Sequence, residues 1–414
     1  MTGNESSFQT GDRIRCTIGA GETEGTFITS REGIAVIKLG SGYNIGVPEE
    51  QCTLITHQEA EAAPEPAEVK QNPNLPLVTI VSTGGTIASK IDYRTGAVTS
   101  QFRASDILHA IPGLSTIAQF RAVQLCNILS ENMTPVIWQQ LARAIHDEIA
   151  SGAAGVIVTH GTDTMAYSAA AISFMVQTPV PIVFVGSQRS ADRPSSDNLM
   201  NGLCAARAAT SELGEVVVVM HADTSDDICA IHRGTRVRKM HTSRRDAFQS
   251  HGIGPVGTVA YPDLQVSLTS DAIRRNASPL KLADRLEEKC ALLTYYPGMD
   301  PALLSGYSGY KGIVLSGTGL GHVSSPFIEK LATLIVQGTT VVMTSQCLHG
   351  RVCDRVYDTG RDLLNIGVIE GEDMLPEVAL VKLMWVLANA TGPQEVREMM
   401  QKNLVGEINR RSRS

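Results

Sequence analysis

The chain has 414 residues, so we expect more than one domain. Its net charge is −7, which excludes a protein that binds nucleic acid through its overall charge; an RNA partner would have to meet a local patch or another protein of a complex. Hydrophobic residues make up 43% of the chain, but no apolar stretch reaches the ~20 residues that cross a bilayer, so we expect no membrane association.

The cysteines and the first residues of the chain indicate its compartment. The 8 cysteines include no Cys-x-x-Cys pair, and their spacing predicts neither a zinc ribbon nor a disulfide framework. No cluster of His, Cys and Asp has metal-ligand spacing, so we expect no metal site. Glu5 and Asp12 precede any apolar run, which argues against a signal peptide. We therefore expect a protein of the reducing cytoplasm.

Residues 1–56 have the pattern of a small β-barrel. Runs such as "RIRCTI" (13–18) and "IAVIK" (34–38) are rich in β-branched residues and bounded by glycine. Their charges are nearly balanced, which favours contact with protein over direct contact with RNA. Residues 57–76 contain four prolines and no apolar periodicity, so we expect a linker there.

From residue 77 onward, apolar strands alternate with helices. The segment 134–150 predicts a helix, because Thr134 can cap it, Pro135 suits its first position, and isoleucine or leucine recurs at every fourth position. Runs of valine and isoleucine predict buried parallel strands covered on both faces. These runs lie at 155–159, 181–186 and 215–220.

A second α/β block follows a less regular, arginine-rich segment at 225–284. Its predicted strands are "CALLTYY", "GIVLS" and "TTVVMTS", and its last helix is "PEVALVKLMWVLA". The pattern therefore predicts one α/β domain over 77–270, another over 285–395, both with mainly parallel sheets, and a tail at 396–414.

Two predicted strand ends in the first block are rich in hydroxyl groups. "STGGT" (82–86) ends one strand, and "THGTDTM" (159–165) begins at the end of another. Ligands bind at the carboxyl ends of the strands in doubly wound sheets. We therefore expect Thr86, Thr162 and Asp163 to converge on one cleft.

These strand ends lack the sequence motifs of phosphate-binding and dinucleotide-binding sites. No Gly-Lys-[Ser/Thr] follows Gly84 and Gly85, so a phosphate loop is excluded, and "SGTGLGH" (316–322) has the spacing of a strained turn rather than of a dinucleotide fingerprint. Two interpretations stay open: a structural turn, or nucleophilic chemistry by threonine. A threonine hydroxyl needs a base, which a lysine of lowered pKa can provide, and the N–H groups of a glycine-rich turn can stabilise an oxyanion.

The motifs "STGGTIAS", "THGTDTM" and "RKMHTS" resemble the two threonine motifs and the lysine segment of bacterial-type L-asparaginases and glutaminases. "GSQRSADRPSSDN" and "NILSENMTP" are also similar to segments of that family, and the resemblance covers residues 77–395. The β-rich module and linker in front, with "STGGTIASKIDYRTGAV" and "EDMLPEVALVKLMWVLA", resemble the GatD family of archaeal-type glutamyl-tRNA(Gln) amidotransferases. This resemblance implies two asparaginase-like α/β blocks preceded by a small SH3-like β-barrel.

The resemblance also implies an activity and partners. In that family the GatD chain hydrolyses glutamine, and the ammonia passes to a GatE-like partner, which uses ATP and Mg to amidate Glu-tRNA(Gln). We therefore expect glutamine or asparagine as substrate, no cofactor on this chain, tRNA contact mainly through the partner, and a homodimer within a heterotetramer. A free-standing L-asparaginase and a catalytically silent scaffold or RNA-binding module stay as alternatives; the intact motifs argue against the silent scaffold, and the N-terminal module argues against the free-standing enzyme.

The family's catalytic residues match this chain at four positions. Thr86 matches the first threonine, the nucleophile on the amide carbonyl. Thr162 and Asp163 match the second threonine and its aspartate. Lys239 matches the lysine that pairs with that aspartate and relays a proton from Thr162. Both threonines are expected to be required, whichever of them attacks.

Substrate-binding positions follow from the same resemblance. Ser130 and Asp163 match the positions that hold the α-amino and α-carboxylate groups, with Glu131 and Gly85 as further candidates. The family's lid tyrosine is absent, because the best-matching position here is Ala97. Tyr93, four residues earlier, is therefore the candidate lid residue.

The residues around these motifs have plainer interpretations. His160 is expected to pack beside the second threonine motif or to support it. The arginines near Lys239 predict either an exposed loop or a surface for tRNA or a partner. These arginines are Arg233, Arg236, Arg238, Arg244 and Arg245.

Overall fold

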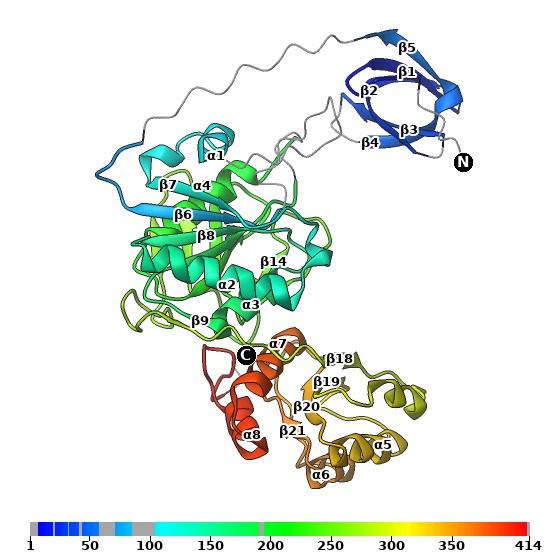
Figure 1. Ribbon diagram of the computed structural model, residues 1–414, viewed down its shortest axis with the longest axis vertical. Coiled ribbons are helices and arrows are strands. Elements are labelled where there is room, and N and C mark those ends of the chain that lie inside the picture. Colours follow the sequence, from blue (N-terminus) through cyan, green and yellow to red (C-terminus); the bar gives the residue numbers. More distant parts are fainter. Residues whose placement is uncertain are drawn as a thin grey trace.

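The computed structural model describes residues 7–19, 21–31, 33–40, 44–57, 71–84, 104–189 and 194–411 (Figure 1). Most of the predicted linker at 57–76 lies outside these residues. Within these ranges, no helix is long and apolar enough to cross a membrane.

The N-terminal module is a strongly curved antiparallel sheet in the order β4-β3-β2-β1-β5 (Figure 1). Ile14 and Cys16 of β1 are buried, whereas Arg13 and Arg15 are exposed, so the sheet buries one face as alternation requires. The predicted small β-barrel module is present as this curved sheet, and among the described residues its outer strands β4 and β5 are not paired with each other, so the barrel is not closed. The elements are β1 (Arg13–Ile18), β2 (Gly21–Arg31), β3 (Ile34–Leu39), β4 (Asn44–Pro48), the 3-10 helix η1 (Glu49–Gln51) and β5 (Cys52–Thr56).

A disulfide joins Cys16 of β1 to Cys52 of β5. The two residues face each other across the ladder, with Cα atoms 4.1 Å apart. The expectation of no disulfide was therefore wrong for this pair. Cysteine spacing could not predict it, because the residues are 36 positions apart and meet only when β1 and β5 pair.

The first α/β block is built on a sheet in the order β16-β15-β12-β11-β10-β8-β6-β7. The strands from β11 to β7 are parallel, and β6, β8, β10 and β11 are almost wholly buried, which explains their runs of valine and isoleucine. The parallel strands are β6 (Leu77–Ser82), β7 (Gln119–Gln124), β8 (Gly155–Thr159), β10 (Ile182–Val185) and β11 (Val216–His221).

The segment 225–284 is more regular than the sequence predicted. Three of its strands extend the main sheet in antiparallel order, and two others form a separate pair, β13-β14. These strands are short and are separated by polar turns, so they give no long apolar run. They are β12 (Ile228–Arg233), β13 (Val237–Lys239), β14 (Phe248–Ser250), β15 (Gly257–Ala260) and β16 (Val266–Leu268), with β17 (Lys281–Leu282) paired to β9 (Val176–Gln177).

Helices cover both faces of this sheet. α2 and α3 pack on one face with α7 of the second block, and α1 and α4 pack on the other. The predicted cap of α2 is confirmed, because the Thr134 hydroxyl accepts the Ile137 N–H. The elements are α1 (Ala104–Ala110), η2 (Leu114–Thr116), η3 (Ser130–Asn132), α2 (Pro135–Ala150), α3 (Met165–Met175) and α4 (Asn198–Ala209).

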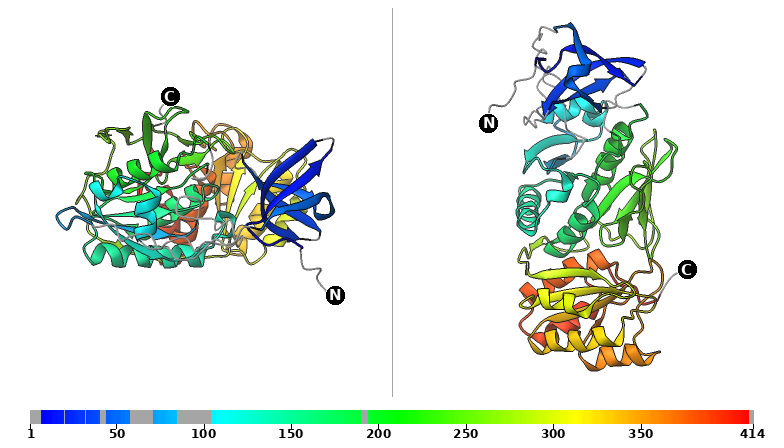
Figure 2. Two further views of the ribbon diagram at one scale, coloured as in Figure 1. Left: turned by 90° about the horizontal axis from the view of Figure 1, so that it is seen from above. Right: turned by 90° about the vertical axis from the view of Figure 1, so that its right-hand side faces the viewer.

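The second block is a smaller parallel sheet in the order β18-β19-β20-β21, with helices on both faces. It lies at one end of the first block (Figures 1 and 2), and α7 packs against α3 at the junction. The elements are β18 (Cys290–Thr294), η4 (Pro301–Tyr307), β19 (Gly312–Gly317), α5 (Ser325–Val336), β20 (Thr340–Ser345), α6 (Asp358–Asn365), β21 (Ile369–Glu370), α7 (Pro376–Asn389) and α8 (Pro393–Gln401).

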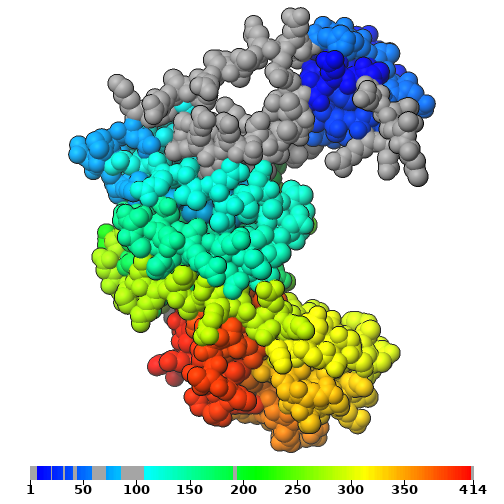
Figure 3. All heavy atoms as spheres, in the orientation of Figure 1, coloured from blue at the N-terminus to red at the C-terminus, as the bar shows by residue number. Residues whose placement is uncertain are grey.

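The C-terminal segment is packed as far as Asn409. Residues 396–414 were predicted to be a tail, but α8 continues to Gln401, and Met400 and Ile408 are buried in the core. Glu407 is fully buried against Lys382. The charged composition suggested a solvated tail, whereas the buried lysine neutralises this carboxylate. Figure 3 shows the end of the chain, in red, at the junction of the two α/β blocks.

Candidate active site

The ends of β6 and β8 lie side by side, and both carry hydroxyl groups. Ser82 and Thr159 are register partners, and the Thr159 hydroxyl donates to Ser82 Oγ at 3.1 Å. The backbone N–H and the hydroxyl of Thr83 both donate to the Thr159 carbonyl, at 3.1 and 3.0 Å. The two threonine motifs therefore begin at the same edge of the sheet, which is the carboxyl edge where ligands bind in such folds.

Glycines let the backbone approach closely at this edge. Gly84 has φ 117°, and a Cβ there would lie 2.5 Å from the carbonyl oxygen of Ile128. A Cβ on Gly161 would lie 2.7 Å from the Cβ of Ser130. The loop that carries Ser130 is therefore pressed against both motifs, and only residues without a side chain fit at these two positions.

Lys239 reaches this edge from β13 and contacts the second motif. Its Nζ lies 2.8 Å from Thr162 Oγ1 and 2.6 Å from Asp163 Oδ1. The lysine side chain is 13% exposed, whereas that of Asp163 is 69% exposed. A lysine between a hydroxyl and a carboxylate can exchange a proton with the hydroxyl, while the exposed carboxylate stays able to meet a ligand.

The other predicted site residues divide into two groups. Ser130 is buried in the 3-10 helix η3, where its carbonyl accepts the Thr164 hydroxyl at 2.7 Å, and Glu131 beside it is exposed. Ser130 and Glu131 thus flank the Thr162 turn. Gly85, Thr86 and Tyr93 lie outside the described residues, so their roles stay predictions.

His160 supports the turn rather than reacting. Its Nδ1 lies 2.6 Å from the Gly161 carbonyl and its Nε2 lies 2.8 Å from Ser168 Oγ. A carbonyl can only accept, so Nδ1 carries the hydrogen and Nε2 accepts from Ser168, whose oxygen in turn accepts from Trp138 Nε1 at 2.8 Å. Burial lowers the pKa of His160 to about 4, so the ring is neutral at pH 7.

Asp197 is a supporting residue that sequence reasoning missed. It is fully buried and accepts hydrogen bonds from four groups around the end of β10, beside β8. The donors are Ser187 Oγ at 2.8 Å, Gln188 N at 3.0 Å, Arg189 N at 2.9 Å and Asn201 Nδ2 at 2.8 Å. Its segment, 186–198, resembles a segment of the asparaginase family, but an aspartate directly before a helix predicts only a helix cap and not this supporting role.

The arginines near Lys239 are divided between the interior of the protein and an exposed stretch at 240–244, which contains Arg244. Arg233 and Arg236 are buried, and all five arginines are paired with carboxylates of this chain. Arg233 pairs with Glu215, Arg236 with Asp373, Arg238 with Glu377, Arg244 with Asp246 and Arg245 with Asp226. The expected exposed loop is confirmed for Arg244 and wrong for Arg233 and Arg236, whose carboxylate partners are 18 and 137 positions away along the chain.

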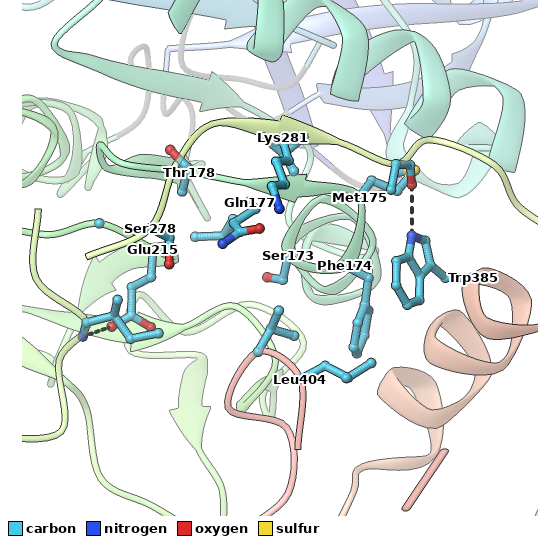
Figure 4. A pocket seen from close by; sticks show the side chains of 16 residues that line it. Ser173, Phe174, Met175, Gln177, Thr178, Glu215, Ser278, Lys281, Trp385 and Leu404 are labelled. Atoms are coloured by element: carbon cyan, nitrogen blue, oxygen red, sulfur yellow. Dashed lines mark hydrogen bonds between the residues drawn. The ribbon is translucent and has the colours of Figure 1, made fainter. Parts of the chain in front are cut away.

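A cavity of about 360 Å³ lies away from these residues (Figure 4). Its wall is mainly apolar, with Phe174 and Trp385 from the two blocks and Lys281 as a charged group. Val216, at the amino end of β11, also lines it, so the cavity is at the opposite edge of the sheet from Thr162. In the part of the chain that the structure describes, no group of three His, Cys, Asp or Glu residues could hold a metal ion.

Solved asparaginases share the two-block fold. The L-asparaginase of Thermococcus kodakarensis is 30% identical with a TM-score of 0.71, and the similarity covers 80% of this chain and 99% of that one. L-asparaginase I of Vibrio cholerae is 27% identical with a TM-score of 0.70, covering 81% and 99%.

The fold, together with threonine, aspartate and lysine at the carboxyl edge of the sheet, defines a protein of the asparaginase and glutaminase class. Residues 77–273 match the asparaginase N-terminal model and residues 289–400 match the glutaminase/asparaginase C-terminal domain. Residues 8–56 match the GatD N-terminal domain. The chain belongs to the GatD family of glutamyl-tRNA(Gln) amidotransferases. It is 56% identical to the Methanosarcina mazei GatD over 97% of this chain and 98% of that one, and 54% identical to the Archaeoglobus fulgidus GatD over 96% and 95%.

Proposed function

We propose that this chain is the glutaminase component of a tRNA-dependent amidotransferase. It hydrolyses the side-chain amide of glutamine, or asparagine, and supplies ammonia to a GatE-like partner. The partner uses ATP and Mg to convert Glu-tRNA(Gln) to Gln-tRNA(Gln). The observation that carries the proposal is the contact of Lys239 with both Thr162 and Asp163 in a chain 56% identical to the GatD of Methanosarcina mazei.

The proposed chemistry divides amide hydrolysis into two steps. The Thr86 oxygen attacks the amide carbon and its proton passes through Thr162 to Lys239, which must be neutral to receive it. The carbon–nitrogen bond then breaks, ammonia leaves with a proton returned by Lys239, and an ester on Thr86 remains. Water attacks this ester and releases glutamate and the threonine. N–H groups near Gly85 stabilise the oxyanion in both steps.

Substrate binding is proposed at the open side of the same edge. The exposed carboxylate of Asp163 suits the α-ammonium of an amino acid, and its contact with Lys239 Nζ orients it. Ser130 and Glu131, on the loop beside the Thr162 turn, are the further residues proposed to hold the α-groups. Tyr93 is the proposed lid residue.

The proposed assembly is a homodimer within a heterotetramer in the cytoplasm. The N-terminal module at 1–56 would contact the GatE-like partner, the α/β domain over 77–270 carries the catalytic motifs, and the domain over 285–395 would close the site of the second copy. Glu-tRNA(Gln) is held mainly by the partner. Sedimentation velocity at micromolar concentration tests the dimer, and an active monomer would contradict it.

The function is tested by measuring ammonia release from glutamine and from asparagine under three conditions. The chain is assayed alone, with the purified GatE-like partner, and with both the partner and Glu-tRNA(Gln). Hydrolysis is expected to rise about 5- to 150-fold on assembly, the range of a coupling of roughly 1–3 kcal/mol. Full-speed asparagine hydrolysis by the chain alone, unchanged by either addition, would favour the free-standing asparaginase. No hydrolysis under any condition would favour the silent scaffold.

A further inference from the structure

The strand that carries Lys239 needs support from outside its own sheet. β13 and β14 have three residues each and pair only with each other, with Lys239 opposite Phe248. A two-stranded ribbon of this length is not stable by itself. Yet it must keep the lysine ammonium within hydrogen-bond reach of Thr162.

Side chains along this strand divide between the two α/β blocks. Alternate residues of a strand face opposite sides, so Val237 and Lys239 share one side of β13 and Arg238 faces the other, while Arg236 lies in the turn immediately before the strand. Val237 is fully buried in the hydrophobic core that α2 and α3 of the first block share with α7. The two arginines pair with Asp373 and Glu377, which lie just before and in the first turn of α7 in the second block. The lysine strand therefore lies between the blocks.

Arg236 makes the most complete of these connections. Its side chain is 1% exposed and that of Asp373 is 3% exposed. Nη1 lies 3.1 Å from Asp373 Oδ2 and Nη2 lies 3.3 Å from Oδ1, so the pairing is bidentate. Nη1 also donates to the Asp373 carbonyl at 3.1 Å, and Nε donates to the Gly406 carbonyl at 2.9 Å. One guanidinium thus binds the lysine strand, the second block and the C-terminal segment together.

The same network holds the other strand of the ribbon. Asp373 accepts from Asn409 through its backbone N–H at 2.9 Å and through Nδ2 at 2.8 Å. Asn409 Nδ2 also donates to the carbonyl of Gly252, just after β14, at 3.2 Å. A Cβ on Gly252 would lie 2.9 Å from Arg236 Nη1. The base of the ribbon is therefore held at both strands, with no room for a larger residue at Gly252.

We propose that Arg236 is a positioning residue for Lys239. With Asp373 and the C-terminal segment 402–409, it fixes β13 so that the lysine meets Thr162. Amide hydrolysis then depends on a contact with the second block that is made three residues before the lysine, about 10 Å away if the chain between them is extended. A displacement of ~1 Å at a reacting group costs on the order of 10²-fold in rate. The inference rests on the proposed function, in which Lys239 relays the proton.

The first test is the kinetics of Arg236→Lys and Asp373→Asn in the assembled complex. Each substitution loosens the ribbon without removing Lys239, so we expect kcat for glutamine hydrolysis to fall about 10- to 100-fold while KM stays within about twofold. The matched control is Arg233→Lys, which alters another buried arginine of the same segment whose carboxylate partner, Glu215, lies in the first block. The control is expected to retain its kcat.

The second test asks whether Arg236 acts through the lysine. The residual hydrolysis by Lys239→Ala is measured with added ethylamine as a proton carrier. Adding Arg236→Lys to this variant should not lower its kcat further. An undiminished effect in that background would mean that Arg236 supports the fold in general, and would overturn the inference. So would a wild-type kcat in folded Arg236→Lys. If that variant does not fold, Asp373→Asn and Asn409→Ala decide by the same criteria. Wild-type hydrolysis by Lys239→Ala alone would overturn the proposed function as well.

Discussion

Lys382 of α7 and Glu407 of the C-terminal segment form an ion pair in which neither side chain is exposed. Their charged atoms lie 2.6 Å apart, and Lys382 Nζ also donates to the carbonyls of Met400 and Lys402. Glu407 accepts the N–H groups of the turn before it. The pair is therefore fully satisfied, and it fixes the segment that reaches Arg236.

Removing one partner of this pair leaves a buried charge without compensation. We expect Glu407→Ala to lower the free energy of unfolding by roughly 3–5 kcal/mol, measured by urea denaturation. Asp358→Ala is the control, because it removes a solvent-exposed pair with Arg361 and should cost at most about 1 kcal/mol. Equal losses in the two variants would contradict the structural role of the buried pair.

Thr86→Val and Thr162→Val each remove a hydroxyl and keep the side-chain shape. Loss of a nucleophile or of its proton path should lower glutamine turnover at least ~10³-fold while thermal unfolding stays near that of the wild type. Thr116→Val, at an exposed threonine, is the control. Near wild-type turnover at saturating glutamine in either variant would remove that threonine from the mechanism.

His160 makes stability depend on pH. Its pKa in the folded chain is about 4, below the ordinary 6.5, because burial disfavours the charged ring. The unfolded chain therefore binds more protons between these values, and stability falls as the pH drops from about 6.5 to 4. The loss from this group is on the order of 2–3 kcal/mol. His160→Gln, which does not titrate, should show a shallower loss in urea unfolding at pH 7, 5.5 and 4.5. Parallel curves would contradict this assignment.

Local patterns predicted the elements around the site, but long-range pairings were beyond them. Threonine before proline gave the start of α2, and continuous valine and isoleucine gave the buried strands, because these signals depend on neighbouring residues. Lys239 was identified only through resemblance. The role of Arg236 could not be predicted from local patterns, because its partner Asp373 is 137 positions away and the two residues meet only when the blocks pack.

Errors in the sequence prediction have the same physical origin. The charged residues of the C-terminal segment suggested a solvent-exposed tail, because the sequence does not show that Glu407 pairs with the buried Lys382. Short strands such as β15 draw their stability from neighbours in the sheet rather than from their own pattern. In the C-terminal segment and in these short strands, tertiary contacts rather than the local sequence determine whether a residue is buried and ordered.

The most direct measurement follows the amide nitrogen itself. The chain, its GatE-like partner, ATP, Mg and Glu-tRNA(Gln) are supplied with glutamine labelled with ¹⁵N in the side-chain amide, and Gln-tRNA(Gln) is analysed for the label. The account predicts that the wild-type chain transfers the label, that Thr162→Val does not, and that added ammonium restores amidation in that variant, because only the supply of ammonia is lost. Label transfer at the wild-type rate by Thr162→Val, or no transfer by the wild-type complex, would contradict the account.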